Sequence, residues 1–129
     1  MIAISASNEE ADISGRIADL REIGLTIRAL ATSATTSVTF RAAGHDPAPY
    51  DRALAELIVN QGSGALVSIQ GNALCISAAP ERLEELASCF FFAEDARQGQ
   101  HFHFEPMPGD PDYSADSLAL VVSVHHSGA

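Results

Sequence analysis

The chain has 129 residues, of which 47% are hydrophobic and 19% are charged, with nine glycines and six prolines. This composition is typical of one globular domain covering residues 1–129, and it excludes a disordered or collagen-like chain. All seven basic residues are arginine, seventeen residues are acidic, and the net charge is −10. Such a charge argues against nucleic-acid binding, because those proteins neutralise phosphates with Lys and Arg.

The sequence shows no targeting signal, so we expect the chain to lie in the cytoplasm. The N-terminus has no basic region, which excludes a secretory signal or a mitochondrial presequence, and no apolar run reaches the length of a membrane span. Cys75 and Cys89 lie 14 residues apart without a C-x-x-C motif. This spacing favours reduced core thiols over a disulfide framework or a zinc site.

The first elements follow from hydrophobic spacing. Residues 1–6 and 11–14 alternate apolar and polar side chains around a polar turn, which predicts an opening hairpin. From Arg16 the apolar residues recur with helical spacing. Residues 35–41 are rich in β-branched side chains and predict a strand, and 45–49 predict a loop, because the residue before each proline is disfavoured in a helix.

The middle of the chain predicts a set of short strands. Residues 54–60 fit either a strand or a helix, and we favour a strand that forms a hairpin with residues 65–70. Gly71-Asn72 then forms a two-residue turn into a further strand at 73–77.

The last third predicts a helix and two strands. Pro80 suits the first helical position, and an apolar stripe continues from there to Ala93. Residues 100–105 predict a strand, 106–116 an acidic Pro/Gly loop, and 118–124 a strand that is apolar on both faces.

One segment is echoed later in the chain. Residues 13–23 align without gaps on residues 76–86, at an offset of 63, and share a strand end, a small-residue turn and the start of a helix. The echo is compatible with two repeated halves sharing one sheet, or with chance similarity of two strand-to-helix junctions. Either interpretation predicts an α+β fold, with a mostly antiparallel sheet and two helices packed on one of its faces.

The segment His101-Phe102-His103-Phe104-Glu105 has the two-residue period of a strand. His101, His103 and Glu105 then share one face and could ligate a metal, whereas the two phenylalanines belong to the core. The alternative is the polar face of a half-buried strand, which we favour because no second ligand pair of recognisable spacing occurs in the chain. We therefore expect no metal and no cofactor.

No motif for catalysis stands out. The chain lacks a G-x-S-x-G elbow, and the carboxylate pairs Glu84/Glu85 and Asp110/Asp112 suit a solvated surface. We thus expect no catalytic residues. The run Phe90–Phe92 sweeps too wide an angle for one helical stripe, so either the helix ends there and all three rings are buried, which we favour, or one ring is left for a partner.

Residues 99–122 carry the most specific pattern in the chain. They read Gly-x-His-x-His-x-Glu, then Pro-Gly-Asp-Pro-Asp-Tyr, then Ser-Leu-Ala-Leu-Val-Val. This pattern resembles the closing motif of the immunity protein 32 family of bacterial polymorphic toxin systems, and weaker similarity extends back to Tyr50. The chain departs from the family at Ala78, Pro106 and Asp112, where Gly, an aromatic residue and His are usual. The missing His further weakens the metal interpretation.

The resemblance implies a small cytoplasmic α+β protein that binds and blocks a cognate toxin and has no catalysis of its own. The acidity is compatible, because a nuclease toxin presents a basic cleft that an acidic protein can occupy. Candidate partner-binding residues are Glu105, Asp110, Asp112, Tyr113 and Asp116, followed by Glu81, Glu84 and Glu85.

Two other classes of function remain open. One is a metal- or small-ligand-binding protein, or an enzyme, that uses the strand face of His101, His103 and Glu105. The other is a homo-oligomer, such as a homodimer, joined through residues 118–124 if that apolar strand lies at the edge of the sheet.

Overall fold

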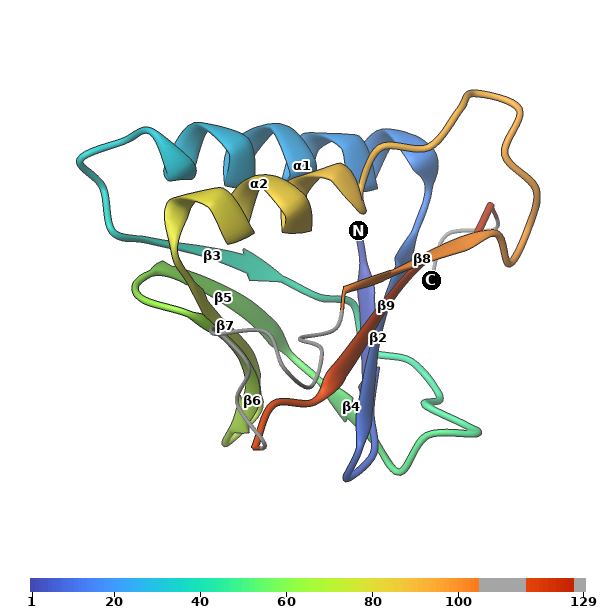
Figure 1. Cartoon of the computed structure of the whole chain (residues 1–129). Helices are drawn as coiled ribbons and strands as arrows, with labels where there is room; N and C mark the ends of the chain where they lie inside the picture. Colours follow the sequence, from blue (N-terminus) through green and yellow to red (C-terminus); the bar gives the residue numbers. More distant parts are fainter. Residues whose placement is uncertain (105–115, 127–129) are drawn as a thin grey trace.

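The computed structural model describes residues 1–104 and 116–126, which form two helices and nine strands (Figure 1). In chain order these elements are β1 (Ala3–Ala6), β2 (Glu10–Gly15), α1 (Ile17–Ala31), β3 (Ser37–Arg41), β4 (Arg52–Leu54), β5 (Glu56–Gln61), β6 (Ala65–Gln70), β7 (Ala73–Ala78), α2 (Pro80–Ser88), β8 (His101–Phe104) and β9 (Ala119–Val124). None of the helices in these ranges is long and apolar enough to cross a membrane.

The strands form two sheets, with α1 and α2 side by side over them (Figure 1). Sheet I has the order β4-β1-β2-β9-β8, and sheet II has the order β3-β5-β7-β6. The pairing is antiparallel except for β2 with β9 and β5 with β7. The expected α+β class and mostly antiparallel pairing are confirmed, but the strands divide between two sheets where we expected one.

The echo at an offset of 63 extends through most of the fold. It maps β2 onto β7 and β5 onto β9, and it reproduces strand registers: Ala3 opposite Ser14 becomes Leu66 opposite Ser77. The parallel pair β2–β9 likewise becomes β7–β5. We call residues 1–63 the first half and 64–126 the second half. Each half is completed by the other, since β9 joins sheet I and β5 joins sheet II.

This exchange overturns two expectations. The predicted strand at 54–60 is present as β5, but β5 and β6 form no hairpin, because β7 lies between them. The strand at 118–124 is present as β9, yet it is no sheet edge, because it lies between β2 and β8. Hairpin pairing is the usual choice for neighbouring strands, and here the parallel β5–β7 ladder replaces it.

The helices cross closely at two small residues that are equivalent in the two halves, Gly24 and Ala87. A methyl group at Gly24 would lie 3.1 Å from the carbonyl oxygen of Ala87 and 3.0 Å from Cβ of Phe90. The glycine therefore permits the close approach of α2, and α1 continues through it. Buried side chains from both helices, such as Leu20 and Leu83, join both sheets in one hydrophobic core.

The three consecutive phenylalanines lie beyond the helix, since α2 ends at Ser88 rather than continuing to Ala93. The turn that follows buries Phe90 and Phe92, as we expected. Phe91 is half-buried instead, with the guanidinium carbon of Arg28 4.5 Å from its ring centre. The expectation that all three rings are buried is thus correct for two of them.

The structure confirms one of the two core residues that we predicted on strand β8. Phe104 is buried, but Phe102 is 41% exposed, which contradicts our expectation. The reason is position: in the described residues β8 is the outermost strand of sheet I, and Phe102 finds Phe92 as its aromatic neighbour, at 4.9 Å between ring centres.

Candidate functional site

The outer faces of the two sheets, which point away from the helices, occupy equivalent places in the fold but differ in chemistry. On sheet I, Glu10 and Asp12 project from β2. Their equivalents on β7 of sheet II are Ala73 and Cys75. The outer face of sheet II carries Arg41 and Glu56 at its margin. On sheet I, carboxylates and imidazoles occur together, and we call this outer face the polar face. It comprises Ser5, Glu10, Asp12, His101, His103 and Ser123.

Asp12 is the most perturbed carboxyl group of the polar face. Burial raises its pKa, and the hydroxyl of Ser123, which donates to Oδ1 at 3.0 Å, lowers it again in part. Glu10 also raises the pKa of Asp12, whereas His101 and His125 lower it. Asp12 is therefore a carboxyl group whose charge is costly in the folded state.

The loop that follows β3 is held on the polar face by two side-chain contacts. Nε2 of His45 lies 2.6 Å from Oγ of Ser5, and Nδ1 lies 3.4 Å from the carbonyl oxygen of Ala43. The hydroxyl of Tyr50 donates to Glu10, which together with burial raises the pKa of Tyr50. A Ser–His pair can act in nucleophilic catalysis, but here it joins a loop to the sheet, as Tyr50 does.

His101 and His103 lie on the exposed side of β8, as predicted, with their rings edge to face at 5.0 Å. Glu105, the third residue of the predicted set, lies outside the described residues. Within residues 1–104 and 116–126, no three His, Cys, Asp or Glu side chains come together closely enough to hold a metal ion.

Most of the predicted partner-binding loop also lies outside the described residues, namely Asp110, Asp112 and Tyr113. Asp116 is described and exposed. It lines a surface hollow of about 350 Å³ together with Asp51 and Arg52. Asp116 is thus accessible beside residues of the first half.

The secondary candidates are brought together on α2. Glu81, Glu84 and Glu85 are all exposed, and Glu85 accepts an ion-pair contact from Arg82 at 2.8 Å. Two further exposed acids, Glu94 and Asp95, follow in the turn after α2. We call these five acids the acidic surface.

The equivalent positions on α1 are not acidic as a group. Ala18 corresponds to Glu81 and Arg21 to Glu84. The acids of α2 are therefore not required for packing the helix in this fold.

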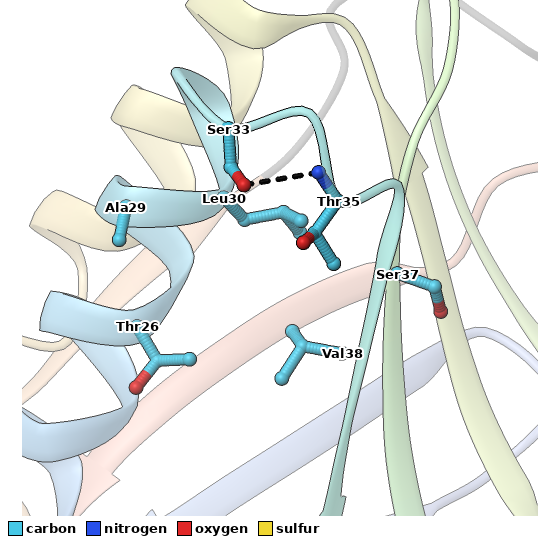
Figure 2. Close-up of a pocket in the computed structure, with 7 residues that line it drawn as sticks. All are labelled: Thr26, Ala29, Leu30, Ser33, Thr35, Ser37 and Val38. Carbon is cyan, nitrogen blue, oxygen red and sulfur yellow. Dashed lines mark hydrogen bonds between the residues drawn. The ribbon is translucent and has the colours of Figure 1, made fainter.

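A groove opens between the end of α1 and the start of β3 (Figure 2). Its volume is about 240 Å³, and Leu30 from α1 and Val38 from β3 line opposite walls (Figure 2). The lining residues are uncharged: Thr26, Ala29, Leu30, Ser33, Thr35, Ser37 and Val38. The hydroxyl of Ser33 accepts a hydrogen bond from the backbone of Thr35 at 3.0 Å and holds the turn that closes one end. We call this the α1–β3 groove.

Both cysteines are buried and free, in agreement with the expectation of reduced thiols. Burial raises the pKa of the Cys89 thiol to about 11, and the nearby charge of Glu85 adds to the effect. Burial raises the pKa of Cys75 as well. Both groups are therefore thiols, not nucleophilic thiolates, at neutral pH.

The sequence interpretation missed Asp12, Ser5 and the loop residues His45 and Tyr50. A usable signal was present for Asp12, because the repeat offset of 63 makes it equivalent to Cys75. A carboxylate at only one of two equivalent strand positions indicates a difference in role. No local motif connects Ser5 with His45, which lie 40 residues apart.

Comparison of the chain with family models, with curated proteins and with solved structures gave no match. The resemblance to immunity protein 32 therefore stays a prediction. The described geometry contains partly buried ionisable groups, an acidic surface and an uncharged groove, all of which are open to solvent or to a partner.

Proposed function

We propose that this protein binds a cognate bacterial toxin and neutralises it by contact, without catalysis of its own. The observation that carries the proposal is the acidic surface: five exposed carboxylates on and after α2, at positions where the first half has mostly neutral or basic residues. Charges that the fold does not need, gathered on one exposed surface, are suited to recognition of a basic partner.

The resemblance of residues 99–122 to immunity protein 32 supplies the class of partner. A toxin that cleaves nucleic acid has a basic cleft, and a protein carrying a net charge of −10 can approach such a cleft by electrostatic steering. Both proteins would act in the cytoplasm, where the toxin finds its substrate.

The test is protection and association with the toxin domain encoded beside this chain in its genome. Co-expression in bacterial cells should restore growth that the toxin domain alone prevents. The double variant Glu81→Lys/Glu84→Lys should slow association about ten-fold at low salt, and added salt should reduce the difference.

A matched control carries the same change of charge on the first half. Glu9 and Glu22 are exposed, so Glu9→Lys/Glu22→Lys alters the net charge equally without touching the acidic surface. If both double variants slow association equally, the effect comes from net charge and not from the acidic surface. Failure of the wild-type chain to protect cells would contradict the proposed function itself.

A further inference from the structure

We propose that copies of this chain associate head to tail, with the surface around Phe102 of one copy docking in the α1–β3 groove of the next. The proposal does not depend on toxin binding. It follows from a difference between the two halves: one has an exposed aromatic ring, and the other has an uncharged groove at the equivalent place.

The equivalence of the two places is given by strand register. Val38 on β3 lies opposite Val59, and Phe102 on β8 lies opposite Val122, which is Val59 shifted by 63 residues. Val38 and Phe102 therefore occupy the same position of the repeated fold. In the second half that position holds a phenyl ring packed at a tilt against Phe92, whereas in the first half the smaller Val38 lines the groove.

The size of the groove favours a side chain as its occupant. Its volume of about 240 Å³ is below the roughly 300–1,000 Å³ of pockets that hold cofactors or drug-sized ligands. Figure 2 shows Leu30 and Val38 on its two walls, one from the helix and one from the strand. Aromatic side chains are the common anchors of protein interfaces, because they bury a large area for few rotatable bonds.

Charge points to a second copy as the source of that side chain. The segment that lines the groove, residues 26–38, carries one arginine, Arg28, and no acid, in a chain of net charge −10. The segment that presents Phe102, residues 79–104, carries five acids and two arginines, a net charge of −3. Phe102 is 41% exposed on that negative segment. One copy thus offers the ring and the charge that complement the groove of another.

The outer edge of β3 adds hydrogen-bonding groups beside the groove. The carbonyl oxygen of Thr36 accepts a hydrogen bond from the N–H of Gln61 at 2.7 Å. The N–H of Ala42 donates to the carbonyl oxygen of Ala55 at 2.8 Å. Because these bonds alternate along an antiparallel strand, the backbone groups of Ser37 and Thr39 point away from β5. In the described part of the chain β3 is the outermost strand of sheet II, and such an edge readily pairs with another chain.

The two docking surfaces are different, so the association is heterologous: each copy offers one surface and receives on the other. The contact is small, and we expect a weak association that grows with protein concentration and weakens with salt. Sedimentation equilibrium of the purified chain over a range of concentrations, up to about 1 mM, measures this directly.

Two variants block one surface each. Ala29→Glu places a charge in the groove at an exposed helical position, and Phe102→Ser removes the ring. Each variant alone should remain a single chain at concentrations where the wild type associates. Ala18→Glu adds the same charge to an exposed position near the other end of α1 and should associate as the wild type does.

Mixing the two blocked variants is the decisive measurement. Ala29→Glu still has its phenyl ring, and Phe102→Ser still has its groove, so an equimolar mixture should form a complex of two chains and nothing larger. A wild type that stays a single chain at every concentration overturns the proposal. A mixture that fails to associate also overturns the proposal. If the wild type associates in that case, the result indicates a two-fold dimer through one shared surface.

Discussion

The two halves of this protein share strands, registers and a helix crossing, yet they differ in the residues placed on that common frame. Core positions are conserved between them: Ile13 and Ile76, or Leu20 and Leu83, are buried at equivalent places. Outer positions are not, as Asp12 and Cys75 show. The comparison shows that the fold requires particular residues at its core positions and tolerates different ones at its outer positions. The candidate functional features lie at the outer positions.

The largest expected effect concerns the inner face of the two outermost strands. Phe104 and Phe40 are equivalent, but Phe104 is buried and Phe40 only half-buried. Phe104→Ala should lower the free energy of unfolding by about 3–5 kcal/mol, because it leaves a cavity in the core. Phe40→Ala should cost clearly less. Urea unfolding of both variants tests this, and equal losses would show that the two halves are packed alike.

The next effect concerns the helix crossing. Gly24→Leu inserts a side chain where even a methyl group would lie 3.0 Å from Cβ of Phe90, so we expect a loss of about 1–3 kcal/mol. Leu25→Ala, at the neighbouring exposed position of α1, serves as the control and should be close to neutral. A stable Gly24→Leu variant with an unchanged melting temperature would contradict the close approach of α1 and α2.

The polar face predicts a pH dependence of stability that arises from Asp12. The raised pKa of Asp12 means that its contribution to stability is fully present below the ordinary pKa of 3.8 and is lost as pH rises through the folded-state value. Asp12→Asn should therefore match the wild type at low pH and become the more stable of the two towards neutral pH. Urea unfolding at about pH 3 and about pH 7 measures the difference.

A matched control for that difference is Glu9→Gln, since Glu9 is exposed. It should give no comparable change between the two pH values. If Asp12→Asn is less stable than the wild type at neutral pH, the hydrogen bond from Ser123 outweighs the cost of burying the charge.

The smallest effect concerns the loop that covers part of the polar face. Tyr50→Phe removes the hydroxyl that donates to Glu10 and should cost about 1 kcal/mol. Because the ring is retained, its packing should be preserved. A loss well above this value, seen in thermal unfolding, would show that the loop has a larger structural role than one hydrogen bond suggests.

Local patterns in the sequence predicted most elements correctly. The hairpin of β1 and β2, helix α1, the Gly71-Asn72 turn and Pro80 at the start of α2 all follow from spacing and turn chemistry over a few residues. Strand β4 was missed, because its three residues are too short for a periodic pattern.

The pairing of strands could not be predicted in the same way. Nothing near residues 119–124 indicates that they lie beside residues 10–15, more than 100 positions earlier. The apolar character of β9 on both faces was a usable signal, since an interior strand in parallel pairing is buried on both sides. We interpreted it as a possible edge, and the position of Phe102 was then also misjudged.

The candidate site was predicted only where it depends on one element. The shared exposed face of His101 and His103 follows from strand period, and the exposed acids of α2 follow from helical spacing. The polar face combines residues of four strands, and the α1–β3 groove lies where Val38 is smaller than its counterpart Phe102. Such features require knowledge of the repeat and of its registers.

The exchange of strands between the halves also determines when sheet I can be completed during synthesis. Sheet I lacks its interior strand β9 until Val124 has left the ribosome, since β8 reaches the rest of that sheet only through β9. A nascent chain that ends before Ala119 therefore presents β2 with an unpaired edge. Contacts so distant in sequence also slow folding, because a long loop must close before they form. The growing chain thus presents the unpaired edge of β2 until β9 has been made.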